Sequence, residues 1–140
     1  MLLLKSMEKN HKQIYELNAI KLAYMGDSVF SLYVRKHFIM WTDKKNADLN
    51  KCVNAIVCAK NQALLMDKVM CMVEGDEIDI VNRAKNLHFN NIAKNSTPEQ
   101  YTKATQFEAL LGYLYLTEQN DKLQKIIDIS LEDYYDSGRD

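Results

Sequence analysis

The segment Leu22 to Val34 (LAYMGDSVFSLYV) constrains this chain most, because it is almost wholly apolar and carries a single charge, Asp27. Its apolar residues recur at helical rather than alternating spacing, and the run is too short to cross a bilayer. A helix that is apolar on most sides belongs inside a protein or inside a dimer. We therefore expect Asp27 to lose hydration and to need a cation, a metal, hydrogen bonds or a water-filled cleft. Gly26 predicts close approach of a neighbouring backbone.

A second segment, Phe107 to Leu116 (FEALLGYLYL), repeats this pattern with one acid, Glu108, and one glycine, Gly112. No cation lies one helical turn from Glu108. Two acids that converge in a core repel each other unless a cation lies between them. A divalent ion such as Mg²⁺ binds one or two carboxylates, keeps several waters and accepts phosphate oxygens. Such an ion can activate water at a phosphodiester.

A structural interpretation of the two acids remains open beside the metal. Each acid can instead form a salt bridge with a basic residue from elsewhere in the chain, and Lys60 or Arg83 would serve. The separation of Asp27 and Glu108 along the chain does not show that the two side chains meet.

The length and composition predict one all-α domain. A chain of 140 residues suits a single compact domain with a real core. Four glycines and one proline leave few turn signals, which favours long helices over many short strands. Capping residues and apolar periodicity then predict the following elements: a short lead-in helix within residues 1–17, a helix capped by Asn18 to about Phe38, one capped by Asn46 to Val57, one over 58–73, one capped by Asp76, a loop over 86–95, a helix with a Thr97–Pro98–Gln100 capping box to about Thr117, and a last helix from Lys122 to about Tyr135.

Charge and cysteine usage narrow the function classes. The net charge of -1 does not favour nucleic-acid binding, but the acidic excess is concentrated in residues 128–140. Arg83, Lys85, Lys94 and Lys103 are opposed in their segment only by Glu99, which allows a local basic surface as well as ordinary solvated side chains.

The three cysteines are odd in number and lack close pairing, which disfavours a zinc site or disulfide framework and favours a cytoplasmic protein. The N-terminal MLLLKSMEKN is typical neither of a secretory signal nor of a transmembrane helix.

The residues around both acids resemble a known enzyme family. LAYMGDSVF around Asp27 and TQFEALLGYLYL around Glu108 resemble the ribonuclease III catalytic domain, and most of all its small bacterial subfamily, Mini-ribonuclease III. AKNQA at 59–63, RAKN at 83–86 and Lys94-Asn95 ahead of Tyr101 fall at family-like positions. The resemblance covers about residues 18–127, which we expect to be the core, followed by a C-terminal helix and acidic tail at 122–140.

The resemblance implies an α-helical homodimer that cleaves double-stranded RNA with Mg²⁺, with Mn²⁺ able to substitute. Each subunit would cut one strand and leave 5′-phosphate and 3′-hydroxyl ends. The implied role is maturation of the large-subunit ribosomal RNA precursor. The catalytic and metal-binding acids of the family correspond to Asp27 and Glu108. The RNA-binding candidates are Lys60, Arg83, Lys85 and Lys94.

Two departures from full-length ribonuclease III bear on the site. The family glutamate before the aspartate is Ala23 here, and the family aspartate before the final glutamate is Thr105. The small subfamily also lacks both acids. The loop over 86–95 is less basic than is usual in that subfamily.

Two other classes of function remain. One is a catalytically inactive ribonuclease III-like module that binds RNA or the ribosome. The other is a helical interaction protein whose acids are salt-bridged. Metal-dependent RNA cleavage separates the enzyme from both.

Overall fold

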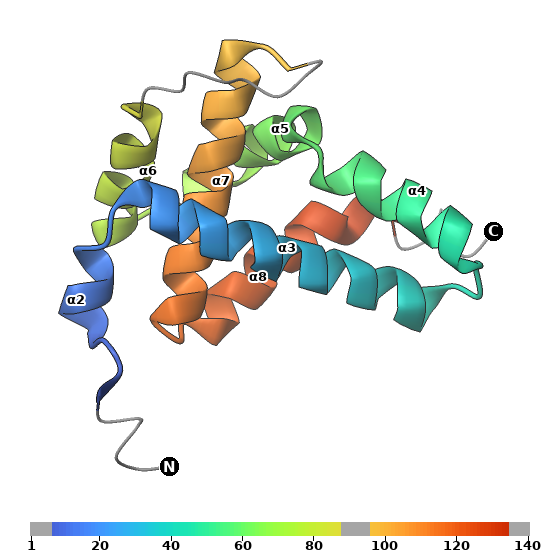
Figure 1. Ribbon diagram of the computed structural model, residues 1–140, viewed down its shortest axis with the longest axis horizontal. Helices are drawn as coiled ribbons and strands as arrows, with labels where there is room; N and C mark the ends of the chain where they lie inside the picture. The colour runs from blue at the N-terminus through green and yellow to red at the C-terminus, as the bar shows by residue number, and fades with distance from the viewer. Residues whose placement is uncertain (1–6, 88–95, 135–140) are drawn as a thin grey trace.

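The chain folds into an all-α structure, as the sequence predicts (Figure 1). The computed structural model describes residues 7–87 and 96–134, and no strand occurs within these two ranges. The elements are the α-helices α2 (His11–Tyr15), α3 (Ala19–Trp41), α4 (Asn46–Val57), α5 (Ala59–Val69), α6 (Asp76–Lys85), α7 (Pro98–Leu116) and α8 (Asn120–Leu131), with short 3₁₀ turns η1 (Met70–Met72) and η2 (Glu132–Tyr134).

The two long helices begin where their capping residues predict. The Asn18 side chain accepts a hydrogen bond from the Lys21 backbone N–H at 2.9 Å, which caps α3. Thr97 and Gln100 form the predicted capping box at the start of α7, with reciprocal bonds of 3.1 Å, and Pro98 is its first residue. These bonds satisfy backbone donors that a helix N-terminus otherwise leaves without partners.

Two predicted caps are wrong by one residue. Asn46 and Asp76 are the first residues inside α4 and α6, and the N-cap positions belong to Lys45 and Gly75. Gly75 has φ of 57°, a backbone conformation that side chains disfavour and that glycine adopts readily. Asp76 therefore acts through its charge in the first turn, where a helix N-terminus favours acids.

The helix predicted over 58–73 ends earlier as an α-helix, at Val69, and continues as the 3₁₀ turn η1. Likewise, the last α-helix runs from Asn120 to Leu131 before η2. Of the loop predicted over 86–95, residues 88–95 lie outside the described part of the chain.

The helix α7 forms the centre of the fold. It packs against α3, α5 and α6, and Figure 1 shows it running through the middle of the molecule with α3 crossing it. Nearly every residue from Ala104 to Leu114 is buried, which explains why the apolar pattern of α7 extends around the whole helix.

Among the described residues, α3 buries one side and leaves the other exposed. Leu22, Phe30 and Val34 are buried, whereas Tyr24 is 81% exposed and Leu32 is 62% exposed. Leu32 lies on the side of α3 that no other described helix covers. The apolar pattern of α3 therefore exceeds what one copy of the chain buries.

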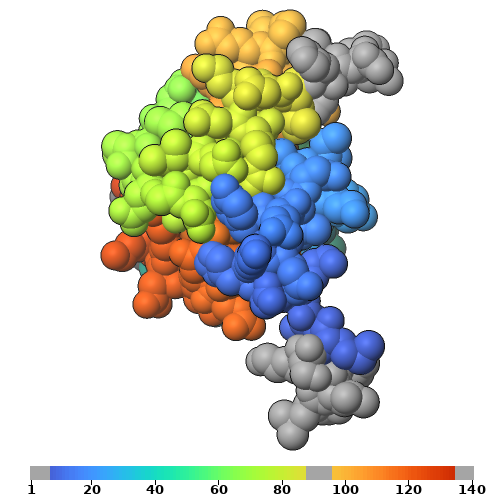
Figure 2. Space-filling model, turned by 90° about the vertical axis from the view of Figure 1, so that its left-hand side faces the viewer, coloured from blue at the N-terminus to red at the C-terminus, as the bar shows by residue number. Residues whose placement is uncertain are grey.

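Arg83 of α6 stabilises the turn that leads into α3. Its guanidinium donates to the backbone carbonyls of Leu17 at 3.0 Å and Tyr15 at 2.7 Å. It also lies over the Tyr15 ring and pairs with Asp79, which accepts a hydrogen bond from the Tyr15 hydroxyl at 2.8 Å. Figure 2 shows the surfaces of α2 and α6 in contact on this side of the molecule.

Replacing Arg83 by alanine should destabilise the fold. The variant leaves the carbonyls of Tyr15 and Leu17 without their donors, and we expect a loss of about 1–3 kcal/mol in the free energy of unfolding. Lys85→Ala removes the same charge from an exposed site on the same helix and should change stability by less than about 0.5 kcal/mol. Urea unfolding of both variants checks this, and equal losses would contradict the structural role of Arg83.

Candidate functional site

Two glycines bring α3 and α7 into direct backbone contact. A β-carbon added to Gly26 would lie 1.6 Å from the backbone oxygen of Glu108, and one added to Gly112 would lie 1.9 Å from that of Leu22. No side chain fits at either position without a shift of the backbone. The close approach predicted for Gly26 is therefore confirmed, and its neighbour is the helix that carries Glu108.

This helix crossing brings the two predicted acids together. Asp27 follows Gly26 on α3, and Glu108 lies one turn before Gly112 on α7. Burial, the negative charge of Asp27 and a hydrogen bond to Asp27 together raise the pKa of Glu108 from its ordinary value near 4.5 to about 8. A carboxylic acid with this pKa is mostly protonated at neutral pH when no cation is bound.

The burial predicted for Asp27 is wrong for the single chain. Asp27 is exposed, whereas Glu108 is partly buried. The reason is that Asp27 lies toward the uncovered side of α3, while Glu108 belongs to the central helix. The pair therefore has one solvated and one desolvated carboxyl, and the site is open to a ligand from the Asp27 side.

No basic side chain neutralises the pair within the described residues. Neither acid takes part in an ion pair there, because Arg83 pairs with Asp79 and Lys60 is exposed and forms no salt bridge. The salt-bridge interpretation with Lys60 or Arg83 is therefore not supported. Two hard oxygen donors without a counter-charge suit a divalent cation such as Mg²⁺, which binds through one or two carboxylates and completes its shell with water and phosphate.

The site offers only these two acids from the described part of the chain. No group of three or more His, Cys, Asp or Glu side chains there is placed to hold a metal ion. The positions of the two missing family acids hold Ala23 and Thr105, both buried, and the Thr105 hydroxyl donates to the Tyr101 carbonyl at 2.8 Å. Neither residue adds a carboxylate to the pair.

The predicted RNA-binding residues differ in their exposure and contacts. Lys60, in the first turn of α5, and Lys85, at the end of α6, are exposed. Arg83 uses its guanidinium nitrogens on Tyr15, Leu17 and Asp79, which makes it a structural residue. Lys94 lies outside the described residues.

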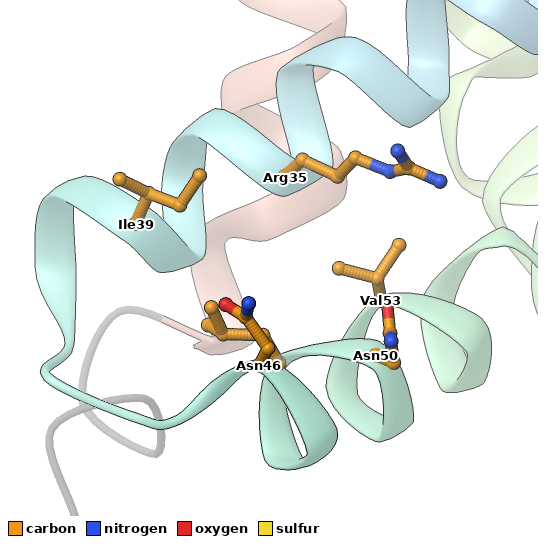
Figure 3. A pocket seen from close by; sticks show the side chains of 6 residues that line it. Arg35, Ile39, Asn46, Asn50 and Val53 are labelled. Carbon is orange, nitrogen blue, oxygen red and sulfur yellow. The ribbon is translucent and has the colours of Figure 1, made fainter.

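Sequence reasoning did not select Arg35, which lines a groove between α3 and α4 (Figure 3). The groove has a volume of about 230 Å³ and is otherwise lined by aliphatic and amide side chains. These are Ile39, Asn46, Leu49, Asn50 and Val53. It contains no acid, so it is separate from the carboxyl pair and offers no metal ligands of its own. Little in the sequence distinguishes Arg35, because a single arginine on an amphipathic helix is common.

No helix within the described residues is long and apolar enough to span a lipid bilayer. The three cysteines are free thiols, and Cys58 and Cys71 are exposed.

The segment that carries the two acids and the two glycines is similar in sequence to known proteins. The ribonuclease III domain family matches residues 20–119, which include both acids and both glycines. Mini-ribonuclease 3 of Enterococcus faecalis is 34% identical over 114 residues, covering 80% of this chain and 86% of that protein. Mini-ribonuclease 3 of Staphylococcus aureus is 32% identical over 124 residues, covering 87% and 91%.

A solved structure shares the fold. The crystal structure of a protein from Fusobacterium nucleatum superposes with a TM-score of 0.77 at 31% identity, covering 84% of this chain and 93% of that one. With the domain match over most of the chain, this likeness shows that the chain belongs to the ribonuclease III family.

Proposed function

We propose that this chain is a divalent-metal-dependent endoribonuclease that cleaves double-stranded RNA, with Asp27 and Glu108 as its metal ligands. Endoribonuclease activity follows from membership of the ribonuclease III family, whose enzymes use divalent metals. The observation that carries the proposal is the meeting of two carboxyls at the α3–α7 crossing, with no cation paired to them among the described residues.

The proposed chemistry follows from the unequal surroundings of the two acids. A bound Mg²⁺, or Mn²⁺ in its place, supplies a Lewis acid that lowers the pKa of water and stabilises charge on a phosphodiester. When bound, the ion would be held by Glu108 from the central helix and by Asp27 from the solvent side, where RNA arrives. RNA phosphate oxygens and water would fill its remaining positions. The products carry 5′-phosphate and 3′-hydroxyl ends.

Double-stranded RNA is the proposed substrate, and the large-subunit ribosomal RNA precursor is the proposed cellular target. A-form RNA is recognised mostly through its shape, its phosphates and its 2′-hydroxyls. Exposed Lys60 and Lys85 are suited to contact phosphates, and Lys94 is proposed as a third contact. The relatives named Mini-ribonuclease 3 support a ribonuclease III-type endoribonuclease, and RNA is therefore the class of substrate proposed. We further propose that residues 1–140 form one catalytic domain acting in the cytoplasm.

A homodimer is the proposed active form, and the uncovered side of α3 supports it. Ile20, Tyr24 and Leu32 are exposed there at helical spacing. A row of large apolar side chains on one helix face commonly marks a protein–protein interface. Two copies meeting through this face would each keep a carboxyl pair next to it.

Neutralising either acid should abolish cleavage. We expect Asp27→Asn and Glu108→Gln each to lower the rate of duplex RNA cleavage in Mg²⁺ by roughly 100-fold or more, which corresponds to ~2.7 kcal/mol of lost transition-state stabilisation. RNA binding, followed by gel shift, should persist. Asp121→Asn removes an exposed acid in the first turn of α8 and should leave the rate unchanged. Wild-type protein that binds the duplex but never cleaves it with any divalent metal would support the inactive RNA-binding module instead.

A charge on the uncovered side of α3 should prevent dimerisation. Leu32→Glu places a carboxylate in the proposed interface, and we expect sedimentation at the 16.3 kDa of one chain rather than at twice that mass. Leu64→Glu is the matched control, because Leu64 of α5 is equally exposed, at 61%, and lies outside this face. Dissociation by Leu64→Glu alone would contradict the proposed interface.

The raised pKa of Glu108 predicts how stability depends on pH without metal. The folded chain holds the Glu108 proton more tightly than the unfolded chain, so this contribution to stability is complete below about pH 4.5 and is lost as pH rises to about 8. The loss is at most about 1.4 kcal/mol per pH unit. Glu108→Gln has no proton to lose, so its stability relative to wild type should grow between pH 5 and 8.

Urea unfolding with a chelator, at several pH values, measures this difference. Groups that do not interact with Glu108 are shared by the two proteins, so their contributions cancel in the comparison. Parallel pH profiles for wild type and Glu108→Gln would contradict the raised pKa of Glu108.

A further inference from the structure

We propose that Gly26 and Gly112 are positioning residues that hold the carboxyls of Asp27 and Glu108 at the separation a shared divalent ion requires. This inference rests on the proposed metal site and extends it. Neither glycine has a side chain to offer the metal, so each acts only through the distance between α3 and α7.

The glycine contacts coincide with the acids along both helices. Gly26 directly precedes Asp27, and the atom that faces it across the crossing is the backbone oxygen of Glu108 itself. A methyl group at Gly26 therefore displaces the residue that carries the second carboxyl. The backbone nitrogen of Gly112 lies 2.9 Å from the same added carbon, so no free space remains on that side.

The contact is reciprocal. A methyl group at Gly112 would lie 1.9 Å from the Leu22 oxygen and 3.0 Å from the Gly26 nitrogen. The three nearest atoms at each position are backbone atoms, which cannot rotate away as a flexible side chain can. The two contacts lie about one turn apart on each helix, so together they fix both the separation of the helices and their relative slide.

The surrounding core prevents a local adjustment. Phe30 of α3 and Phe107 of α7 meet edge to face at 5.1 Å between ring centres, and Leu22 and Leu111 are fully buried. Because interiors are packed at high density, a methyl group inserted here moves whole helices.

That movement of the helices is large compared with the narrow range of metal–oxygen distances. Ordinary contact of a β-carbon begins near 3.4 Å, so the obstructing oxygens must retreat by more than an ångström. Mg²⁺ binds oxygen within a narrow range, about 2.0–2.1 Å. A crossing widened by this amount leaves both carboxyls charged and present, yet too far apart to bind one ion well.

The test is Mn²⁺ affinity of the intact protein without RNA, measured by the electron paramagnetic resonance signal of the free ion. We expect Gly26→Ala and Gly112→Ala each to bind Mn²⁺ roughly tenfold more weakly or worse. The double variant should bind about as weakly as either single one, because both residues set the same separation. Ile126→Val removes a methyl group from the core on α8, away from the crossing, and should bind Mn²⁺ like wild type.

Folded glycine variants that bind Mn²⁺ like wild type would overturn the proposal, as would Ile126→Val losing affinity equally. If the glycine variants do not fold, Phe30→Trp widens the crossing from its flank and should also weaken Mn²⁺ binding, and unchanged affinity in that variant would overturn the proposal. Asp27→Asn and Glu108→Gln separate the two levels. Should they bind Mn²⁺ like wild type, the metal site and the proposal both fail; should only they lose affinity, the positioning role alone is wrong.

Discussion

The backbone contact between α3 and α7 determines how the other helices pack and where the two acids lie. Because Gly26 and Gly112 have no side chains, the two helices approach closely enough for the backbone of each to touch the other. The helix α7 can then pack simultaneously against α3, α5 and α6, which makes it the centre of the core. The same contact brings Asp27 beside Glu108. Fold and candidate site therefore have one physical origin.

That arrangement has an electrostatic cost, which helps to explain why a site like this suits a cation. Glu108 loses part of its hydration and faces a second carboxyl, and its pKa rises to about 8 as a result. Two carboxyls close together without a cation do not stabilise a protein core. Asp27 remains exposed, so the pair is also reachable by a ligand. Desolvation on one side and access on the other are the properties expected of a binding site rather than of packing alone.

Sequence reasoning succeeded where the signal was local. The caps formed by Asn18 and Thr97 depend on residues three positions apart, and both were predicted correctly. The caps assigned to Asn46 and Asp76 were wrong by one residue, because Lys45 and Gly75 hold the N-cap positions of α4 and α6. The resemblance identified the ribonuclease III fold from short motifs around the two acids, and the domain match confirms it.

Contacts between residues that lie far apart in the chain could not be predicted from the sequence. The sequence leaves Arg83 open either to RNA or to a core acid, but its hydrogen-bond acceptors are the backbone carbonyls of Tyr15 and Leu17, which lie far away in the chain. The exposure of Asp27 was missed for a related reason. An apolar pattern predicts that a surface is covered, but it does not say whether this chain or a second copy covers it. The spacing of apolar residues also could not show that Asp27 and Glu108 meet, because that depends on how α3 and α7 cross.

A metal site formed by Asp27 and Glu108 at the α3–α7 crossing can be seen in the anomalous difference density of crystals soaked in Mn²⁺. We expect a peak bound by both carboxylates. A peak bound elsewhere, or no peak at this pair while Mn²⁺ supports RNA cleavage in solution, would contradict it.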